Sequence, residues 1–380
     1  MKNILNTLSK KISSRYSFKD YKFSLAFLVI LISIIGIFVV GSAKQEYQMK
    51  QLMGVLIGIA AMVIISLVDY KWVLKFYWPM YFLNLILLVA VLIAGTEVNG
   101  ATRWLDLGFI QFQPSDLTKI LTILFYAQFL TKKQEVINDK KTIIQGILLI
   151  IPTLILVFKQ PNLSTTICLA LLFCVLMYMG GLSYKFICTV LAIIIPTAAI
   201  LFIILIQPNQ PFIHQYQQNR ILAWLNPEEY ESEEAYQQLN SLMAIGSGKL
   251  IGKGYNSDAT DSVKNGNFIS EPQTDFIFAI VGEELGFIGC CIVIILLLLI
   301  VIKCIMIGMK AKDQAGKIIC CGVSALIAIQ SFINISVATM IFPNTGISLP
   351  FISYGLTSIV CFFMGIGFVL NVGLQTERNR

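Results

Sequence analysis

The amino-acid sequence predicts an all-α protein that crosses a lipid bilayer ten times. Of its 380 residues 57% are hydrophobic and only 13% are charged, about half the charged share usual in soluble globular domains. A spanning helix needs about 20 mostly apolar residues, and the sequence offers ten such segments. They cover residues 23–41, 50–68, 73–94, 115–131, 142–158, 163–180, 184–206, 274–303, 316–341 and 350–373.

Lysine and arginine are distributed unevenly between the two sides of the predicted bundle. With the N-terminus inside, nineteen of the 28 lysines and arginines fall on the cytoplasmic side and eight fall outside. Because such a bias sets orientation, we expect both termini in the cytoplasm and read the net charge of +7 as a topology signal rather than nucleic-acid binding. The predicted parts are a basic N-terminal segment (1–22) without a secretory cleavage site, a membrane domain (23–373) and a C-terminal tail (374–380).

Cysteine and histidine carry little chemistry in this sequence. All nine cysteines lie in or at the ends of apolar segments, where a free cysteine behaves as a small hydrophobe. Their spacing predicts no metal site. The single histidine, His214, lies in an external loop, which disfavours a histidine-based metal centre or a Ser-His-Asp triad.

The long external loop between the seventh and eighth spans, residues 207–273, holds eight acidic and four basic residues. Loops of this length are usually functional. A helix is predicted near 232–246, with an apolar face of Ala235, Leu239, Leu242 and Met243 resting on the membrane or the bundle. The glycine-rich stretch after it lacks the spacing of a phosphate-binding loop, so a flexible re-entrant or surface loop is expected there.

Two basic residues stand out in the segment from 98 to 120. Arg103 lies beside Trp104 in the loop before the fourth span, and Pro114 suits the first turn of that span. Lys119 falls inside the apolar run. An intramembrane lysine is by default a functional candidate, although a lysine that snorkels to the interface is the alternative. The sequence leaves both readings open.

Three carboxylates accompany the eighth span. Asp275 lies at the predicted external mouth, where Thr274 could cap the helix and the helix dipole would favour an ionised aspartate. A plain helix-terminal aspartate explains this residue equally well. In one continuous helix, Glu283 would lie about 80° round and roughly 12 Å deeper than Asp275. Glu284 would face the other way, so no close carboxylate pair of the glycosidase kind is expected.

Six stretches of the sequence resemble the SEDS family (shape, elongation, division and sporulation), which includes RodA, FtsW and SpoVE. They are NGATRWLDLGFIQFQPSDLTK, KQPNLSTT, NRILAWLNPEE, AIGSGKLIGKGY, EPQTDFIFAIVGEELGF and LPFISYG. Their order and spacing match the family from about residue 25 to 375. The resemblance implies a ten-span enzyme that polymerises lipid II, the undecaprenyl-pyrophosphate-linked disaccharide peptide, at the outer face of the bacterial cytoplasmic membrane.

The resemblance also implies roles for single residues. It makes Asp275 the presumed catalytic residue, a general base for inverting transfer. It assigns substrate binding to Arg103, Ser115, Lys119, Gln160, Gln273, Thr274, Glu283 and Ser353. The implied partners are a cognate class B penicillin-binding protein and membrane lipids, with no nucleic acid. No metal ligand is assigned, and a divalent cation (Mg²⁺ or Mn²⁺) stays open as a cofactor.

Two positions depart from the family pattern. Asn162 replaces the aspartate of Gln-Pro-Asp-Leu-Gly, which weakens a cation site there because Mg²⁺ prefers carboxylates. Leu356 replaces the second glycine after Tyr-Gly, which predicts altered helix packing or catalytic efficiency near the site.

Two other functions fit the same sequence. A lipid II flippase would need polar residues through the full depth of the bundle, whereas the ionisable residues here cluster in the outer half. A non-catalytic scaffold for the penicillin-binding protein would need no base at Asp275. The motifs EPQTDF and PNTGISLPF favour a division or sporulation member, whereas WLDLGFIQFQPS favours elongation, and the sequence leaves that choice open.

Overall fold

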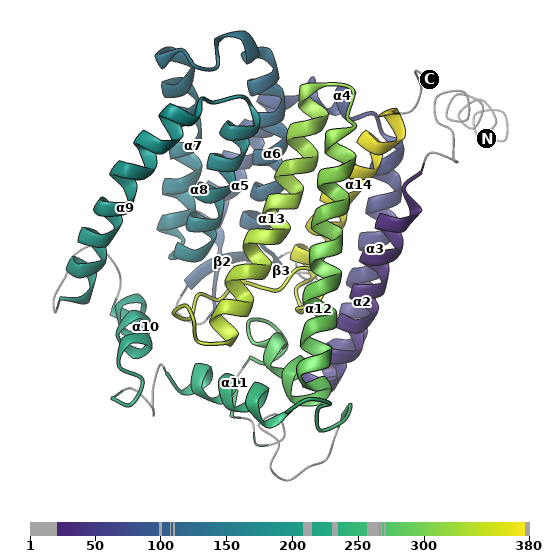
Figure 1. The fold of residues 1–380 in the computed structure, drawn as a ribbon, viewed down its shortest axis with the longest axis vertical. Coiled ribbons are helices and arrows are strands. Elements are labelled where there is room, and N and C mark those ends of the chain that lie inside the picture. Colours follow the sequence, from purple (N-terminus) through teal and green to yellow (C-terminus); the bar gives the residue numbers. More distant parts are fainter. Residues whose placement is uncertain are drawn as a thin grey trace.

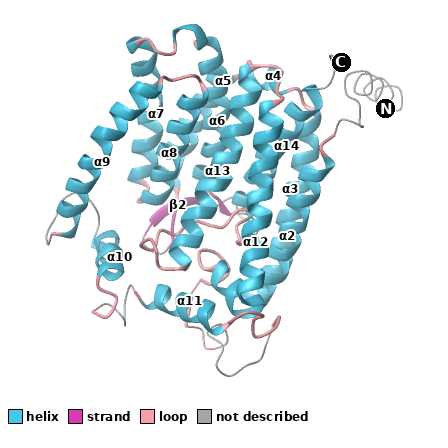
Figure 2. Ribbon diagram, viewed as in Figure 1, coloured by secondary structure: helices cyan, strands magenta, loops and turns pink. Residues whose placement is uncertain are grey.

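The computed structural model describes residues 21–98, 101–106, 108, 111–207, 215–229, 235–256, 266, 268–269 and 271–376. Most of the predicted N-terminal segment (1–22) and the end of the predicted tail (374–380) lie outside this part of the chain. Within it the fold is mostly helical, as predicted (Figure 2).

A helix occupies each of the ten predicted segments over most of its length. These helices are α2 (Phe23–Ala43), α3 (Gln48–Leu67), α5 (Tyr77–Ala94), α6 (Pro114–Lys132), α7 (Lys140–Lys159), α8 (Leu163–Met179), α9 (Tyr184–Ile206), α12 (Ile277–Met309), α13 (Gln314–Ala338) and α14 (Leu356–Thr376). In the described part of the chain, seven helices are long and apolar enough to cross a bilayer, namely α2, α3, α5, α7, α12, α13 and α14. Helices suit this setting because they satisfy every backbone hydrogen bond internally.

The long helices form a bundle with two distinct ends (Figure 1). Helix α2 begins and α14 ends at one end, close to the short helix α4 (Tyr70–Leu74), while α10 (Gln215–Leu225) and α11 (Tyr236–Ser247) lie at the other. Two single 3₁₀ turns, η2 (Gln45–Tyr47) and η3 (Gln134–Val136), join neighbouring helices.

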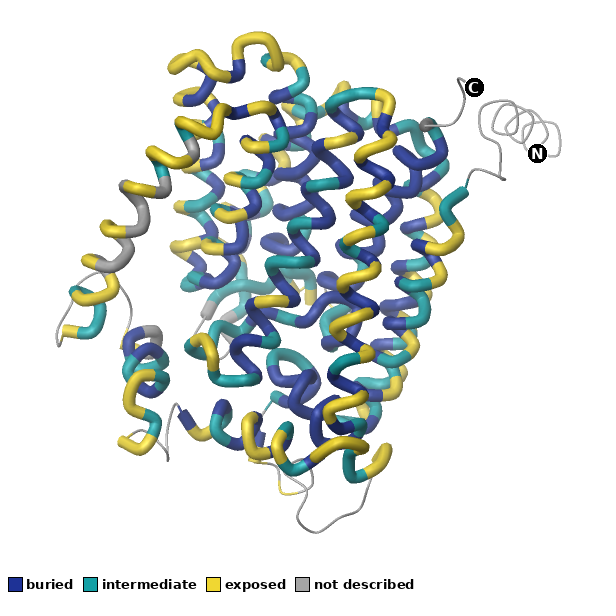
Figure 3. The backbone as a smooth tube through the Cα atoms, in the orientation of Figure 1, coloured by how far each residue is buried: buried dark blue, intermediate teal, exposed yellow. Residues whose placement is uncertain are grey.

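Helices α13 and α14 form the interior of the bundle, whereas α5 lies at its surface (Figure 3). In the most apolar stretch of α14 83% of the residues are buried, against 22% in α5. The outer helices instead expose large apolar side chains such as Phe27, Leu56 and Ile86. An outer surface of this kind matches lipid rather than water.

A small antiparallel sheet departs from the predicted all-α fold. Its strands are β1 (Thr96–Val98), β2 (Ala101–Asp106) and β3 (Gln111–Phe112), in the order β1-β2-β3. The dipeptide Asn99-Gly100 between the first two strands is a strong hairpin signal that could have predicted this pairing. The sheet fixes the backbone of Arg103, which lies on β2.

Helix α11 confirms the predicted helix, and a polar face of it packs on the bundle. Its buried residues include Gln238 and Ser241. Of the predicted apolar face, Ala235 is buried, whereas Leu242 and Met243 are exposed, as the membrane alternative of the prediction allows. Gln238 Nε2 donates to the carbonyls of Val337 (3.1 Å) and Phe342 (2.8 Å), and Ser241 Oγ donates to Ala338 O (2.8 Å). The last carbonyls of a helix lack intrahelical donors, so the end of α13 is satisfied by the polar face of α11. The predicted position Ser232 lies outside the described residues.

Candidate active site

Asp275 lies in a run of turns that precedes α12 rather than in the helix itself. The helix begins at Ile277, and its N-cap, Phe276, makes no side-chain capping bond. The hydroxyl of Thr274 donates to Glu271 O (3.2 Å) instead. The predicted helix start at residue 274 and the predicted cap at Thr274 are therefore wrong, because residues 271–276 turn back on themselves before the helix forms.

Hydrogen bonds from α13 hold Asp275 against the loop between α13 and α14. Asn334 Nδ2 donates both to Asp275 O (2.8 Å) and to Ile347 O (2.7 Å). Asn334 lies one turn before the end of α13 and is 1% exposed. One buried amide thus fixes two loops relative to each other.

Ser353, a predicted substrate-binding residue, makes a second link between the same two loops. Its hydroxyl donates to Thr274 O (2.6 Å) and accepts from Leu349 N (2.7 Å). Tyr354 N adds a bond to Gln273 O (2.8 Å). Because its hydroxyl both donates and accepts a hydrogen bond, each time with a backbone group, Ser353 positions the backbone next to Asp275.

Gly346 faces the carboxylate of Asp275. A Cβ at this position would lie 3.3 Å from Asp275 Oδ2, and the φ of Gly346 is +67°. Glycine adopts this left-handed conformation without steric cost. A small residue therefore keeps the space beside the carboxylate open.

Burial raises the pKa of the Asp275 carboxyl, and Arg220 and Arg103 oppose that rise while Glu271 adds to it. The two arginines belong to α10 and β2, so elements far apart in the sequence converge on one carboxylate. A carboxyl with a raised pKa beside cations suits proton transfer to and from a substrate.

Arg103 also contacts the junction between α7 and α8. Its Nε donates to Gln160 O (3.4 Å), and its Nη2 donates to Pro161 O. Asn162, the departure from the family pattern, caps α8 by accepting from Thr165 N (3.2 Å). The junction that carries the predicted residue Gln160 is thereby fixed beside Arg103.

Lys119 is buried in an ion pair. Its Nζ lies 2.8 Å from Asp116 Oδ1 and 3.0 Å from Gln330 Oε1, and the residue is 4% exposed. Gln330 Nε2 reaches Ser348 O (3.4 Å) in the α13–α14 loop. The snorkelling alternative is wrong, because the ammonium group finds these partners inside the bundle.

We expect Lys119→Met to lower the free energy of unfolding by about 3–5 kcal/mol, because it leaves the Asp116 carboxylate buried without its cation. The double variant Asp116→Asn/Lys119→Met should recover most of that loss. Thermal unfolding of the purified variants measures both. A stable Lys119→Met that makes no product would instead show that the lysine acts on substrate.

Several buried polar atoms near these loops have no hydrogen-bond partner in the described part of the chain. Three belong to predicted substrate-binding residues: Ser115 Oγ, Gln160 Oε1 and Gln273 Oε1. Three others were not predicted: Asn334 Oδ1, Asn344 Oδ1 and Thr345 Oγ1. Most buried polar atoms in proteins are paired, so these six atoms have hydrogen-bonding capacity that the described protein groups leave unused.

Glu283 lies apart from these residues, at a break in α12. Gly286 has non-helical angles (φ 65°, ψ −163°), so α12 is broken just after Glu284. The one continuous helix assumed for Asp275, Glu283 and Glu284 is wrong, because Asp275 precedes the start of α12 at Ile277. Glu283 is 1% exposed and pairs with Lys253 (3.1 Å). Glu284 accepts a hydrogen bond from Ser42 Oγ on α2.

The glycine-rich stretch, residues 248–254, packs against this break in α12. Lys253 N and Gly254 N donate to the carbonyls of Glu283 and Glu284 (2.9 and 3.1 Å). In return the carbonyls of Lys249 and Leu250 accept from the amides of Phe287 and Ile288 (2.9 and 3.2 Å). These bonds satisfy the backbone groups that the break frees, so the stretch has a structural role rather than that of a flexible loop.

Four site residues were not predicted from the sequence, namely Arg220, Asn334, Asn344 and Thr345. Arg220 lies within the family stretch NRILAWLNPEE, and Asn344 and Thr345 lie within PNTG. An arginine in a family stretch of the external loop was the available signal. Nothing in the sequence marked Asn334.

The donor set around Asp275 does not fit a cation held by protein groups alone. In the residues that the structure describes, no three His, Cys, Asp or Glu side chains come together as metal ligands. The electrostatic neighbours of Asp275 are mainly guanidinium groups, whereas Mg²⁺ takes oxygen ligands.

Fold and site together define a multi-pass helical membrane protein with a carboxylate, Asp275, under the influence of two arginines near the α11 end of its bundle. The chain belongs to the cell cycle protein family of FtsW, RodA and SpoVE, whose model matches residues 20–378.

Curated relatives agree with this membership. The chain is 33% identical over 293 residues to the peptidoglycan glycosyltransferase MrdB of Escherichia coli K12, covering 77% of this chain and 76% of the relative. It is 30% identical over 368 residues to the probable peptidoglycan glycosyltransferase FtsW of Trichlorobacter lovleyi, with 93% of each chain covered.

Solved structures share the fold. A chain from a peptidoglycan synthase complex, described as coordinating polymerization and crosslinking, matches with a TM-score of 0.77 at 24% identity, over 94% of this chain and 99% of that one. The rod shape determining protein RodA of Thermus thermophilus matches with a TM-score of 0.68 at 24% identity, over 94% and 98%.

Proposed function

We propose that this chain is a peptidoglycan glycosyltransferase that polymerises lipid II into glycan strands at the outer face of the bacterial cytoplasmic membrane. Membership of a family whose relatives carry that activity in their names supports the reaction. The observation that carries the assignment of the site is Asp275, half-buried and influenced by Arg103 and Arg220.

In the proposed reaction Asp275 is the general base. Its carboxylate takes the proton of the 4-hydroxyl of one lipid-linked disaccharide, and that oxygen attacks the anomeric carbon of another. The new glycosidic C–O bond forms as the bond to the pyrophosphate breaks, with inversion at the anomeric carbon. Undecaprenyl pyrophosphate leaves with the bonding electrons. Such base catalysis contributes typically 10²–10⁴-fold.

The arginines act on the leaving group in this proposal. A pyrophosphate gains negative charge as its bond to the sugar breaks, and a planar guanidinium can contact two of its oxygens at once. The electrostatic influence of Arg103 and Arg220 on Asp275 supports this role. Ser115, Gln160 and Gln273, which carry the unsatisfied atoms, are proposed to bind the sugars. Thr274 and Ser353 are proposed to position the backbone next to Asp275, while Lys119 and Glu283 hold buried ion pairs that support the bundle.

The finer topology belongs to the same proposal. We propose ten spans with both termini in the cytoplasm, a membrane domain over 23–373 and an external loop over 207–273. A helix lies at each of the ten predicted spans, and an even number of spans puts both termini on the same side of the membrane. The bias of lysine and arginine supports the cytoplasm as that side.

A class B penicillin-binding protein is the proposed partner, and membrane lipids are the proposed surroundings, with no role for nucleic acid. The matching synthase complex couples polymerization to crosslinking, which supports a partner that crosslinks. A divalent cation is retained as a proposed cofactor without protein ligands. Dialysis against EDTA, followed by addition of Mg²⁺ or Mn²⁺, tests it.

Proteoliposomes that carry lipid II in both leaflets test the function itself. We expect long glycan strands on gels when the chain and a crosslinking partner are present, without net movement of lipid II. Redistribution of lipid II between leaflets without polymer would indicate a flippase. Absence of both, with synthesis restored by another polymerase bound to this chain, would indicate a scaffold.

The rate of polymerisation should fall as the pH is lowered, because the base form of Asp275 is lost. Since the pKa of this carboxyl is raised, the loss should begin at a higher pH than for an exposed aspartate. Arg103→Gln removes a cation that lowers this pKa, so the acid limb of the pH profile should move to higher pH. An unchanged limb would contradict the assignment of Asp275 as the base.

A further inference from the structure

A cavity of about 390 Å³ opens between the ends of α5, α6 and α7 at the end of the bundle away from α11. It is lined by Tyr77, Trp78, Phe129, Lys132, Lys133, Gln145, Leu148 and Leu149. None of these residues takes part in the proposed active site. The lysine and arginine bias places this end of the bundle in the cytoplasmic leaflet.

The cavity has a charged end beside an aromatic wall. Lys132 and Lys133 close α6, and Lys132 Nζ lies 4.5 Å from the centre of the Tyr77 ring and 3.4 Å from its hydroxyl. The ring face and the hydroxyl hold the ammonium group at the rim. Trp78 packs edge-on against Phe125 at 5.5 Å, which fixes the aromatic side.

The chain that connects α6 to α7, residues 132–141, is net positive. Besides Lys132 and Lys133 it holds Lys140 and Lys141, which begin α7. Its acidic groups are Glu135 on η3 and Asp139, the residue before α7. Lysines therefore outnumber carboxylates four to two in this connection, and only Lys132 and Lys133 line the cavity.

The opposite side of the cavity faces lipid. Leu148 is 59% exposed and Trp78 is 38% exposed, and Ile144 and Phe82 beside them are exposed as well. A free phosphate or nucleotide gains nothing from this apolar wall. A phospholipid fits both halves, with its phosphate on the lysines and its acyl chains along the wall.

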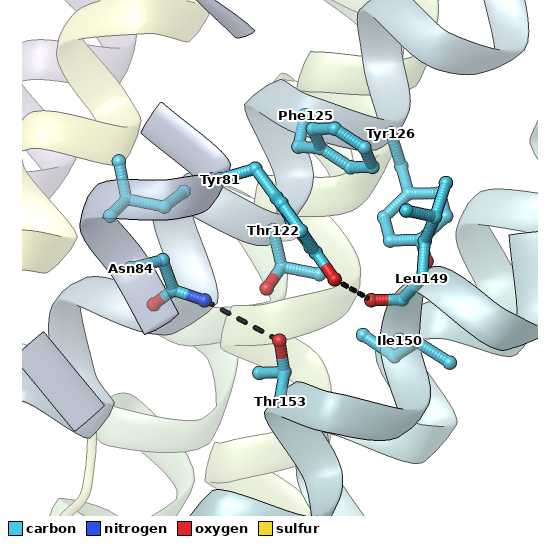
Figure 4. A pocket seen from close by; sticks show the side chains of 9 residues that line it. Tyr81, Asn84, Thr122, Phe125, Tyr126, Leu149, Ile150 and Thr153 are labelled. Atoms are coloured by element: carbon cyan, nitrogen blue, oxygen red, sulfur yellow. Dashed lines mark hydrogen bonds between the residues drawn. The ribbon is translucent and has the colours of Figure 1, made fainter. Parts of the chain in front are cut away.

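Helices α5 and α7, which line the cavity, are linked to each other at a smaller neighbouring void, shown in Figure 4. There Tyr81 OH donates to Leu149 O (2.9 Å) and Asn84 Nδ2 approaches Thr153 Oγ1 (3.5 Å). Phe125 and Tyr126 of α6 pack beside them, around a void of only about 10 Å³. These contacts hold α5, α6 and α7 together next to the cavity.

From this geometry we propose that the cavity binds one anionic phospholipid of the cytoplasmic leaflet, with Lys132 and Lys133 on its phosphate and Trp78 along its chains. The site is independent of the chemistry at Asp275. Binding of this lipid would associate the α5–α6–α7 side of the bundle with membrane that contains anionic phospholipid.

Native mass spectrometry of the full chain, titrated with phosphatidylglycerol or phosphatidylcholine, tests the proposal. We expect one tightly retained phosphatidylglycerol and no comparable phosphatidylcholine. Lys132→Gln/Lys133→Gln should weaken that binding about 30-fold, from about 1 kcal/mol for each lysine near the surface. The matched control Lys140→Gln/Lys141→Gln removes the same charge outside the cavity and should change binding less than about threefold.

Three outcomes would overturn the site. Equal weakening by both double variants would mean diffuse attraction to the lysine-rich end. Equal retention of phosphatidylcholine would mean an annular lipid without headgroup selection. Displacement of phosphatidylglycerol by soluble glycerol phosphate would mean that the site binds phosphate esters without using the apolar wall. Trp78→Ala, which keeps every charge, should weaken phosphatidylglycerol but leave glycerol phosphate unaffected.

Discussion

Replacing Asp275 with asparagine should reduce glycan synthesis by 10²–10⁴-fold, the share that a general base usually contributes. Asparagine keeps the shape of the side chain but cannot take the proton of the attacking hydroxyl. Synthesis would be measured on gels from purified lipid II, with the crosslinking partner present. The matched control is Glu228→Gln, which neutralises an exposed carboxylate on the turn after α10 and should leave synthesis unchanged.

The same variant should fold at least as well as the wild type near neutral pH. A carboxyl whose pKa is raised in the folded state contributes stability at low pH that is lost as the pH rises through that pKa. The neutral amide removes this loss. An Asp275→Asn chain that unfolds early would therefore point to a structural role, and one that polymerises at the wild-type rate would rule out Asp275 as the base.

A side chain in place of Gly252, which contacts the break in α12, should cause a large loss of stability. A Cβ at Gly252 would overlap the carbonyl of Glu284, and the φ of Gly252 is +90°. Gly252→Val should cost about 2–6 kcal/mol, from backbone strain of about 1–3 kcal/mol and from buried backbone bonds worth about 1–3 kcal/mol when broken. Thermal unfolding in detergent, with the yield of folded protein, measures the loss.

Gly246→Ala provides the control for that experiment. Gly246 lies on α11, has no atom within 4 Å of the position of its Cβ, and is not in the left-handed region. Alanine there should be neutral or slightly stabilising, because it favours the helix. If Gly252→Val were as stable as Gly246→Ala, the glycine-rich stretch would not be needed to close the break in α12.

Features that depend on neighbouring residues in the sequence could be predicted, whereas features that depend on contacts between distant segments could not. Hydrophobic runs located all ten helices because each run is itself the local cause of a helix in lipid. Lys119 and Asp275 were identified as unusual because an ionisable residue in an apolar run is costly wherever it sits. Their partners Gln330 and Asn334 were not identified, because an amide within an apolar helix has no local signature.

By itself, the sequence determined the class of the protein, its helical segments, the side chains with acid and base chemistry, and the family motifs that name the reaction. Only the tertiary structure decided which of those side chains meet. It brought Arg103 and Arg220 towards Asp275, and it paired Glu283 with Lys253 at a helix break. The physical reason is that helix formation in a membrane depends on local apolar composition. Charge pairing depends instead on contacts between segments far apart in the sequence, such as those of Arg103 and Asp275, which are about 170 residues apart.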